Sequence, residues 1–108
     1  MVVRADILCG VCGFRCTVEA ASEDGMNVTL KVEGNCPRVQ AMAADLLTLD
    51  AFRELLRMPA VQTTPMLLAA KHKLHPTCLV PTGILKAMEA AAGLALPAES
   101  TIGLERVE

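Results

Sequence analysis

The sequence predicts an α+β fold, with a small antiparallel or mixed sheet of three to four strands and about four helices packed on one of its faces. Two observations lead to this fold class. Three strand-like runs open the chain, and from residue 37 onward the apolar residues recur at helical spacing. A chain of 108 residues without a repeat, linker or low-complexity tract is expected to form a single domain over residues 1–108.

The first strands are expected at residues 2–8, 15–22 and 27–33, and the last two form a hairpin around Asp24-Gly25-Met26. If paired residue numbers sum to 50, one face of the hairpin is apolar and the other carries opposite charges across the strands. The predicted pairs are Val18 with Val32, Ala20 with Leu30, Ser22 with Val28, Glu19 with Lys31, and Thr17 with Glu33.

The helices are expected where a capping residue or proline precedes an apolar run of helical spacing. Cys36 and Pro37 begin a helix over 37–49, Asp50 caps a short helix over 51–58, and Thr64 caps a helix over 65–73. A last helix runs from about 81 or 82 to 92, with Gly93 at its C-terminal end, and residues 102–107 alternate as a terminal strand would.

Composition excludes some functions. Phe14 and Phe52 are the only aromatic residues and the net charge is −2, so neither a basic face nor a base-stacking platform for nucleic acid is expected. Residues 1–6 do not resemble a signal peptide, and the apolar stretch 84–96 is too short to span a membrane. We therefore expect a cytoplasmic protein whose five cysteines are reduced thiols.

Cysteines at the junctions between elements are the main functional signal. The hairpin register places Cys36 opposite Phe14 and brings Cys12 to the same end of the sheet, although the two are distant in sequence. Cys36 also stands at a helix N-terminus, which favours the thiolate form that metals bind. Cys78 lies in the loop before the last helix. Cys12, Cys36 and Cys78 are therefore predicted to share a metal or cluster site, although small buried cysteines are also common.

A fourth ligand could come from either of two residues. Cys9 and Cys12 have the C-x2-C spacing that grips one ion, with Gly10 permitting the tight turn between them. His75 precedes Cys78 by three residues, but a loop histidine that hydrogen-bonds backbone is the commoner case. Cys16 falls on the apolar face of its strand and is expected to pack in the core.

Thiolate ligands favour an iron–sulfur cluster, such as a 4Fe-4S cluster, or zinc. A structural zinc site usually presents two compact ligand pairs, whereas here only Cys9 and Cys12 form a pair, so the cluster is preferred and zinc is the second choice. The expected protein serves electron transfer, cluster delivery or sensing. Four glutamates look like parts of solvated faces rather than a site: Glu19, Glu23, Glu54 and Glu89.

Two alternatives stay open. One is a non-catalytic interaction module that uses the helix over 84–96 as a dimer or partner surface, and a homodimer would also protect the open edge of a small sheet. The other is a thiol redox protein using Cys9 and Cys12.

Four segments also carry a family resemblance: Cys12-Gly13-Phe14, Asn35-Cys36-Pro37, His75-x-x-Cys78, and residues 83–97, GILKAMEAAAGLALP. Over nearly its whole length the chain resembles a family of small uncharacterised proteins from strictly anaerobic archaea and bacteria. The resemblance implies shared roles for Cys12, Cys36 and Cys78, and an anaerobic setting in which oxygen-sensitive clusters survive. The similar proteins carry further cysteines near the positions of Leu74 and Thr82, which this chain lacks.

Overall fold

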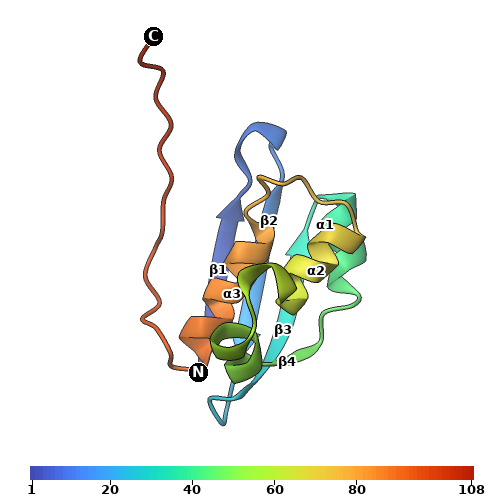
Figure 1. The fold of residues 1–108 in the computed structure, drawn as a ribbon, viewed down its shortest axis with the longest axis vertical. Coiled ribbons are helices and arrows are strands. Elements are labelled where there is room, and N and C mark those ends of the chain that lie inside the picture. Colours follow the sequence, from blue (N-terminus) through green and yellow to red (C-terminus); the bar gives the residue numbers. More distant parts are fainter.

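A computed structural model describes all residues, 1–108, and its centre is one antiparallel sheet of four strands in the order β1-β2-β3-β4 (Figure 1). The strands are β1 (Val2–Leu8), β2 (Arg15–Ala21), β3 (Asn27–Gly34) and β4 (Thr48–Asp50). The predicted α+β class is therefore confirmed, and each strand lies beside its neighbour in the sequence. Strands that follow one another through short connections need no crossover.

The register predicted for β2 and β3 is confirmed. Val18 lies opposite Val32, Ala20 opposite Leu30, and Glu19 opposite Lys31 on the other face, all with numbers that sum to 50. Thr17 also pairs with Glu33 as expected. The alternation of apolar and polar residues decides this register, since a slip by one residue would expose the apolar set.

The turn between these strands is built around the Asp24 carboxylate. It accepts hydrogen bonds from the backbone N–H of Met26 at 2.9 Å and of Asn27 at 2.8 Å, and from the Asn27 side-chain amide at 2.9 Å. Gly25 takes a φ of +74°, which a residue with a Cβ rarely adopts. The hydrogen bonds to its charged form lower the pKa of Asp24 from 3.8 to about 2.

This lowered pKa predicts a pH-dependent loss of stability. Because the folded-state pKa of Asp24 lies below its unfolded value, its contribution is complete above about pH 4 and is lost as the pH falls through about 2. Urea unfolding should therefore show a difference between wild type and Asp24→Ala at neutral pH that shrinks steadily below about pH 4. A difference that stays constant down to pH 2 would contradict this assignment.

The helices all cover the same face of the sheet (Figure 1). They are α1 (Pro37–Ala43), the π-helical turn η2 (Arg53–Arg57), α2 (Thr64–Lys71) and α3 (Val80–Ala91), with two single 3-10 turns, η1 (Gly10–Cys12) and η3 (Ala60–Gln62).

The predicted starts at Cys36 and Asp50 are confirmed. Cys36 is the residue before α1, and the Asp50 carboxylate accepts hydrogen bonds from Phe52 N and Arg53 N. No helix combines the length and the apolar character needed to cross a bilayer.

The core lies between the sheet and the helices, and α3 contributes most to it. Ile84 and Met88 are fully buried against β1 and β2. At Gly83 the helix approaches the sheet so closely that an added Cβ would stand 2.3 Å from Ile7 Cδ1. The apolar face of the last helix is thus buried inside its own domain, whereas Leu94 and Leu96, beyond the end of α3, are exposed.

The other face of the sheet is polar and carries no helix. Five of its side chains line a shallow depression there: Arg4, Thr17, Glu19, Lys31 and Glu33. Their charges alternate in sign across the strands, as Arg4 opposite Glu19 and Glu19 opposite Lys31 show. Because its side chains are charged or polar, this face of the sheet can remain exposed to solvent without a covering layer.

The predicted helix over 37–49 is wrong in its second half. α1 ends at Ala43, and the chain turns back so that β4 pairs with the start of β3. Leu47 is 72% exposed, and its carbonyl accepts a 2.8 Å hydrogen bond from Leu30 N. Hydrogen bonds to the otherwise unpaired edge of β3 replace the helix that the apolar spacing predicts here. A three-residue strand is too short to show an alternating pattern in the sequence.

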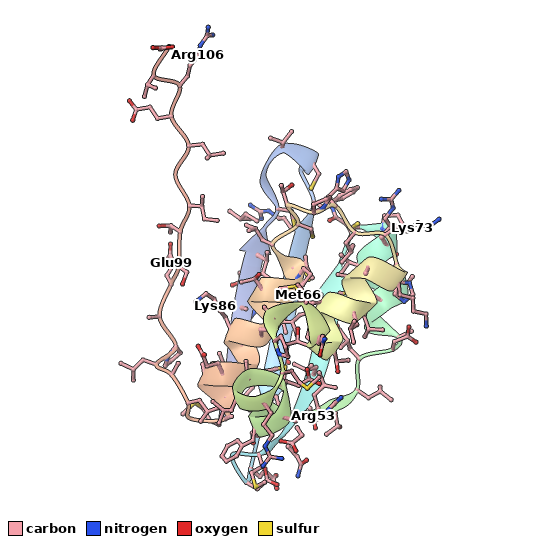
Figure 2. All side chains as sticks on the ribbon, in the orientation of Figure 1. Arg53, Met66, Lys73, Lys86, Glu99 and Arg106 are labelled. Atoms are coloured by element: carbon pink, nitrogen blue, oxygen red, sulfur yellow. The ribbon has the colours of Figure 1, made fainter.

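The predicted terminal strand over 102–107 is also wrong. Residues 96–108 form no regular element, are all exposed, and extend away from the domain as a tail, on which Figure 2 labels Glu99 and Arg106. The start of β3 is paired with β4, so the two edge strands of the sheet are β1 and the three-residue β4. Two alternating apolar residues, Ile102 and Leu104, are too short a pattern to define a strand.

Glu54 is buried rather than solvated, which corrects the expectation for this residue. Its side chain is 1% exposed inside η2, where it accepts a 2.7 Å hydrogen bond from Thr64 N and one from the Thr64 hydroxyl. Arg53 Nη1 lies 3.4 Å from Glu54 Oε1, the oxygen that also accepts from the Thr64 hydroxyl. The carboxylate therefore satisfies the first turn of α2 from ten residues away.

Replacing Glu54 with alanine should consequently destabilise the fold by about 2–4 kcal/mol, since Thr64 loses a buried charged acceptor. Glu54→Gln retains one acceptor oxygen and should cost less. Glu23→Ala, on an exposed turn, serves as the control and should change the free energy of unfolding by less than about 0.5 kcal/mol. Equal effects for Glu54→Ala and Glu23→Ala would show that the buried carboxylate is dispensable.

Candidate functional site

Three separate segments bring four of the five cysteines to one end of the sheet. Cys9 and Cys12 lie on the loop between β1 and β2, Cys36 directly precedes α1, and Cys78 lies in the loop before α3. In Figure 1 this loop, the start of α1 and the orange loop before α3 all lie at the same end of the molecule. The segments that carry Cys12, Cys36 and Cys78 therefore lie at the same end of the molecule.

The loop that carries Cys9 and Cys12 is a single 3-10 turn closed by backbone hydrogen bonds. Cys9 N donates to Phe14 O at 3.1 Å, and Gly13 N donates to Gly10 O at 2.9 Å. Gly10 and Gly13 have φ values of +80° and +74°. The two glycines therefore make the tight turn that places Cys9 and Cys12 next to each other.

The segment leading to Cys36 is held against β2 by its neighbours. The Asn35 side chain accepts a 2.9 Å hydrogen bond from Arg15 N, and Asn35 N donates to Arg15 O at 3.4 Å. A Cβ on Gly34 would stand 2.7 Å from that same carbonyl oxygen. Only glycine fits there, and this close approach fixes where Cys36 and the start of α1 lie.

The loop that carries Cys78 is tied to α1. Arg38 Nη1 donates a 2.7 Å hydrogen bond to Lys73 O, directly after α2 ends. Within the loop, Cys78 N donates to His75 O at 3.0 Å and closes a turn. Together these contacts bring Cys78 to the end of the sheet where Cys36 lies.

The Cys9 thiol is affected by the other three thiols at this end of the sheet. Its pKa is raised to about 11, first by burial and then by the charges of Cys78, Cys12 and Cys36. Three neighbouring thiols can affect Cys9 in this way only if all of them lie near it. The Cys12 thiol also contacts the Cys9 carbonyl oxygen, at 3.8 Å. We name Cys9, Cys12, Cys36 and Cys78 the thiol cluster.

The remaining two candidates lie differently. Cys16 is buried in the core, 3% exposed, which confirms the packing role expected of it. Burial, followed by the charges of Cys9, Cys78 and Cys36, raises its pKa to about 11. The other candidate, His75, is exposed on the loop surface. Of the two options for a fourth ligand, Cys9 is the one with three cysteines near it.

As the side chains stand, no group of three or more His, Cys, Asp or Glu residues is arranged to hold a metal ion. The thiols are neighbours without being in ligand geometry, so a bound metal or cluster would have to draw them together. Cys12, which lies on the exposed η1 turn, has the most freedom to move. A site that takes its final geometry only with its metal is common in small metalloproteins.

The raised pKa of Cys9 bears on the redox alternative. A nucleophilic or redox-active cysteine usually has a lowered pKa, supplied by a helix N-terminus or a neighbouring cation. Cys9 instead has a pKa of about 11 and thiols around it. This environment counts against Cys9 as an attacking thiol.

A family model described as "Family of unknown function (DUF6951)" matches residues 3–104, which include every cysteine and most of the tail. No curated protein and no solved structure matches the chain. The match spans nearly the whole sequence, so the chain belongs to the family of unknown function DUF6951.

Proposed function

We propose that this protein binds an iron–sulfur cluster through the thiol cluster and serves electron transfer, cluster delivery or sensing. The observation that carries the proposal is that three separate segments bring four cysteines to one end of the sheet. Apolar packing alone does not require this arrangement. Cys16, which does pack in the core, is buried, whereas Cys12 is exposed and Cys9, Cys36 and Cys78 are half-buried.

The positions of these cysteines suit ligands. All four lie at the ends of elements, where the backbone can adjust, and none lies within a strand. Cys36 stands directly before the first turn of α1. Four cysteine ligands are the usual set for a 4Fe-4S cluster.

Zinc is the second choice for the same thiols, because four thiolates also form tetrahedral zinc sites. The cluster is preferred because only Cys9 and Cys12 form a compact ligand pair, whereas Cys36 and Cys78 each come from a segment of their own. The resemblance to proteins of strict anaerobes supports the same choice, since oxygen-sensitive clusters survive in a reducing cytoplasm. A cytoplasmic location is part of this proposal.

The test is to purify the protein without oxygen, supply iron and sulfide, and measure bound iron, acid-labile sulfide and visible absorption. Iron and sulfide in equal amounts, with broad visible absorption from thiolate-bound iron, would support the proposal. A protein that stays colourless and free of iron after reconstitution would end it. One equivalent of zinc in place of iron would move the assignment to a zinc site.

A further inference from the structure

β1 is the longer of the two edge strands of the sheet, and the direction of its backbone groups can be read from its pairing with β2. Met1 N and Ser22 O are 2.7 Å apart and Ser22 N and Met1 O 3.0 Å apart, so these two residues exchange both hydrogen bonds. Cys9 and Phe14 continue the same alternation. The odd-numbered residues of β1 therefore bond to β2, and the even-numbered ones direct their N–H and C=O groups outward.

The side chains of those outward-directed residues lie on the polar face of the sheet. They are Val2, Arg4, Asp6 and Leu8, and all four are exposed. Val2 and Leu8 are 69% and 60% exposed. Large apolar side chains at both ends of an otherwise polar edge need a reason. A sheet edge with free N–H and C=O groups is also a ready surface for another strand.

We propose that β1 pairs antiparallel with β1 of a second copy around a two-fold axis at Ala5. Outward-directed groups can meet only outward-directed groups, so even-numbered residues must face even-numbered residues across the interface. A centre at Ala5 aligns the full seven-residue strand with its copy. It places Arg4 opposite the partner's Asp6 and Val2 opposite the partner's Leu8.

The charges select this register over its neighbours. A two-fold axis at Arg4 would set Arg4 against its own copy, and an axis at Asp6 would set Asp6 against its own copy. Like charges directly opposite one another destabilise a sheet, whereas opposite charges stabilise it. Arg4 and Asp6 are already within 3.5 Å of each other along β1, with side chains 65% and 71% exposed. Only the Ala5 axis gives each charge an opposite one.

The same arrangement accounts for the apolar residues. Val2 and Leu8 cover each other at both ends of the interface, and on the helix-covered face Val3 lies opposite the partner's Ile7. Four outward-directed residues on each copy supply about eight backbone hydrogen bonds. The product is one continuous eight-stranded sheet with all helices on the same side. An edge protected against pairing would carry charges of one sign, so that copies repel. β1 carries one charge of each sign.

The antiparallel arrangement sets the two thiol clusters apart. Cys9 directly follows β1, so each cluster would lie beside the other copy's N-terminus and not beside the other cluster. The dimer therefore does not depend on metal or cofactor binding, and either proposal can fail without the other.

The test uses the complete chain and measures mass in solution by light scattering and sedimentation. Wild type should have twice the 11.4 kDa monomer mass. Arg4→Asp and Asp6→Arg should each weaken dimerisation about ten-fold or more, because two opposite-charge pairs become like-charge pairs. Mixing the two variants should restore association, since each aspartate of one variant then faces an arginine of the other. Circular dichroism confirms that each variant is folded.

The matched control exchanges Lys31 and Glu33, an exposed pair on the same polar face but away from the edge, and should leave the dimer intact. A wild type that stays monomeric at its highest workable concentration overturns the proposal, as does a dimer that neither charge reversal affects. Deleting residues 98–108 should also leave the dimer unchanged. Loss of association on that deletion would show that the tail, rather than β1 of a second copy, pairs with this edge.

Discussion

Serine in place of Cys36 is expected to abolish cofactor binding while leaving the sheet folded. Cys36 precedes α1 and lies near Cys9, so its thiolate is one of the four proposed ligands. Changing even an outer-shell partner of a metal typically costs about 10–100-fold in affinity, and losing a ligand should cost more. Iron and sulfide measured after anaerobic reconstitution should therefore fall to background in Cys36→Ser. Cys78→Ser should behave in the same way.

The control is Cys16→Ala, which also removes a cysteine from this end of the molecule. Cys16 packs in the core, so its replacement should lower stability modestly and leave the iron content unchanged. His75→Ala, on the exposed loop, should likewise retain the cofactor. Loss of iron in Cys16→Ala with full retention in Cys36→Ser would refute the ligand set.

Stability offers a second readout of the same variants. A ligand that binds only the folded state stabilises it, by about 4 kcal/mol when its concentration exceeds Kd a thousand-fold. Reconstituted wild type should thus unfold at higher denaturant than the apo protein, whereas Cys36→Ser should show no such increase. If the cysteines merely pack, reconstitution would change neither protein, and iron would be absent from both.

Local rules explain why much of the sheet is predictable. The β2–β3 register follows from alternation along two adjacent strands and from a turn whose chemistry is contained in Asp24 and Gly25. The start of α1 follows from Cys36 and Pro37 in the same way, because the cap and the first helical residue are neighbours. In each case the deciding interactions join residues that lie close together in sequence.

The features that sequence reasoning missed depend on distant partners. Glu54 looks like any surface carboxylate until Thr64, ten residues later, is placed against it. β4 forms by pairing with the start of β3, and the three residues Thr48–Asp50 show no alternation that would predict a strand. The prediction that Thr64 caps this helix is also wrong: Thr64 is the first residue of α2, and its N–H is bound by the Glu54 side chain, which only the tertiary fold brings there.

The thiol cluster was predictable in part: one of its contacts follows from local pattern and another depends on a distant strand. Its convergence is predicted from the β2–β3 register, yet the structure brings Cys9 there through the hairpin of β1 and β2, closed by Cys9 N and Phe14 O. The β1–β2 pairing could not be predicted from the β2–β3 register, and it places Cys9 directly after β1 at the end of the sheet. Its signal is present in the C-x2-C spacing with its two glycines.

Shortening Ile84 to alanine should strongly reduce the stability of the fold. Ile84 is fully buried between the helix and the sheet, and such truncations cost about 2–5 kcal/mol. The cost should lie near the upper end of that range. At Gly83 the helix already touches Ile7, where an added Cβ would be 2.3 Å from Cδ1. The helix therefore cannot move closer to the sheet to fill the space.

Urea unfolding should show this loss directly, against a total stability of about 5–15 kcal/mol for a domain of ordinary size. Lys86→Ala is the control, because Lys86 is exposed on the same helix (Figure 2) and its removal should change stability by less than about 0.5 kcal/mol. Ile84→Val, which removes one methylene, should fall between the two at about 1 kcal/mol. A loss below about 1 kcal/mol for Ile84→Ala would mean that α3 can settle into the cavity, and that its contact at Gly83 does not hold it in place.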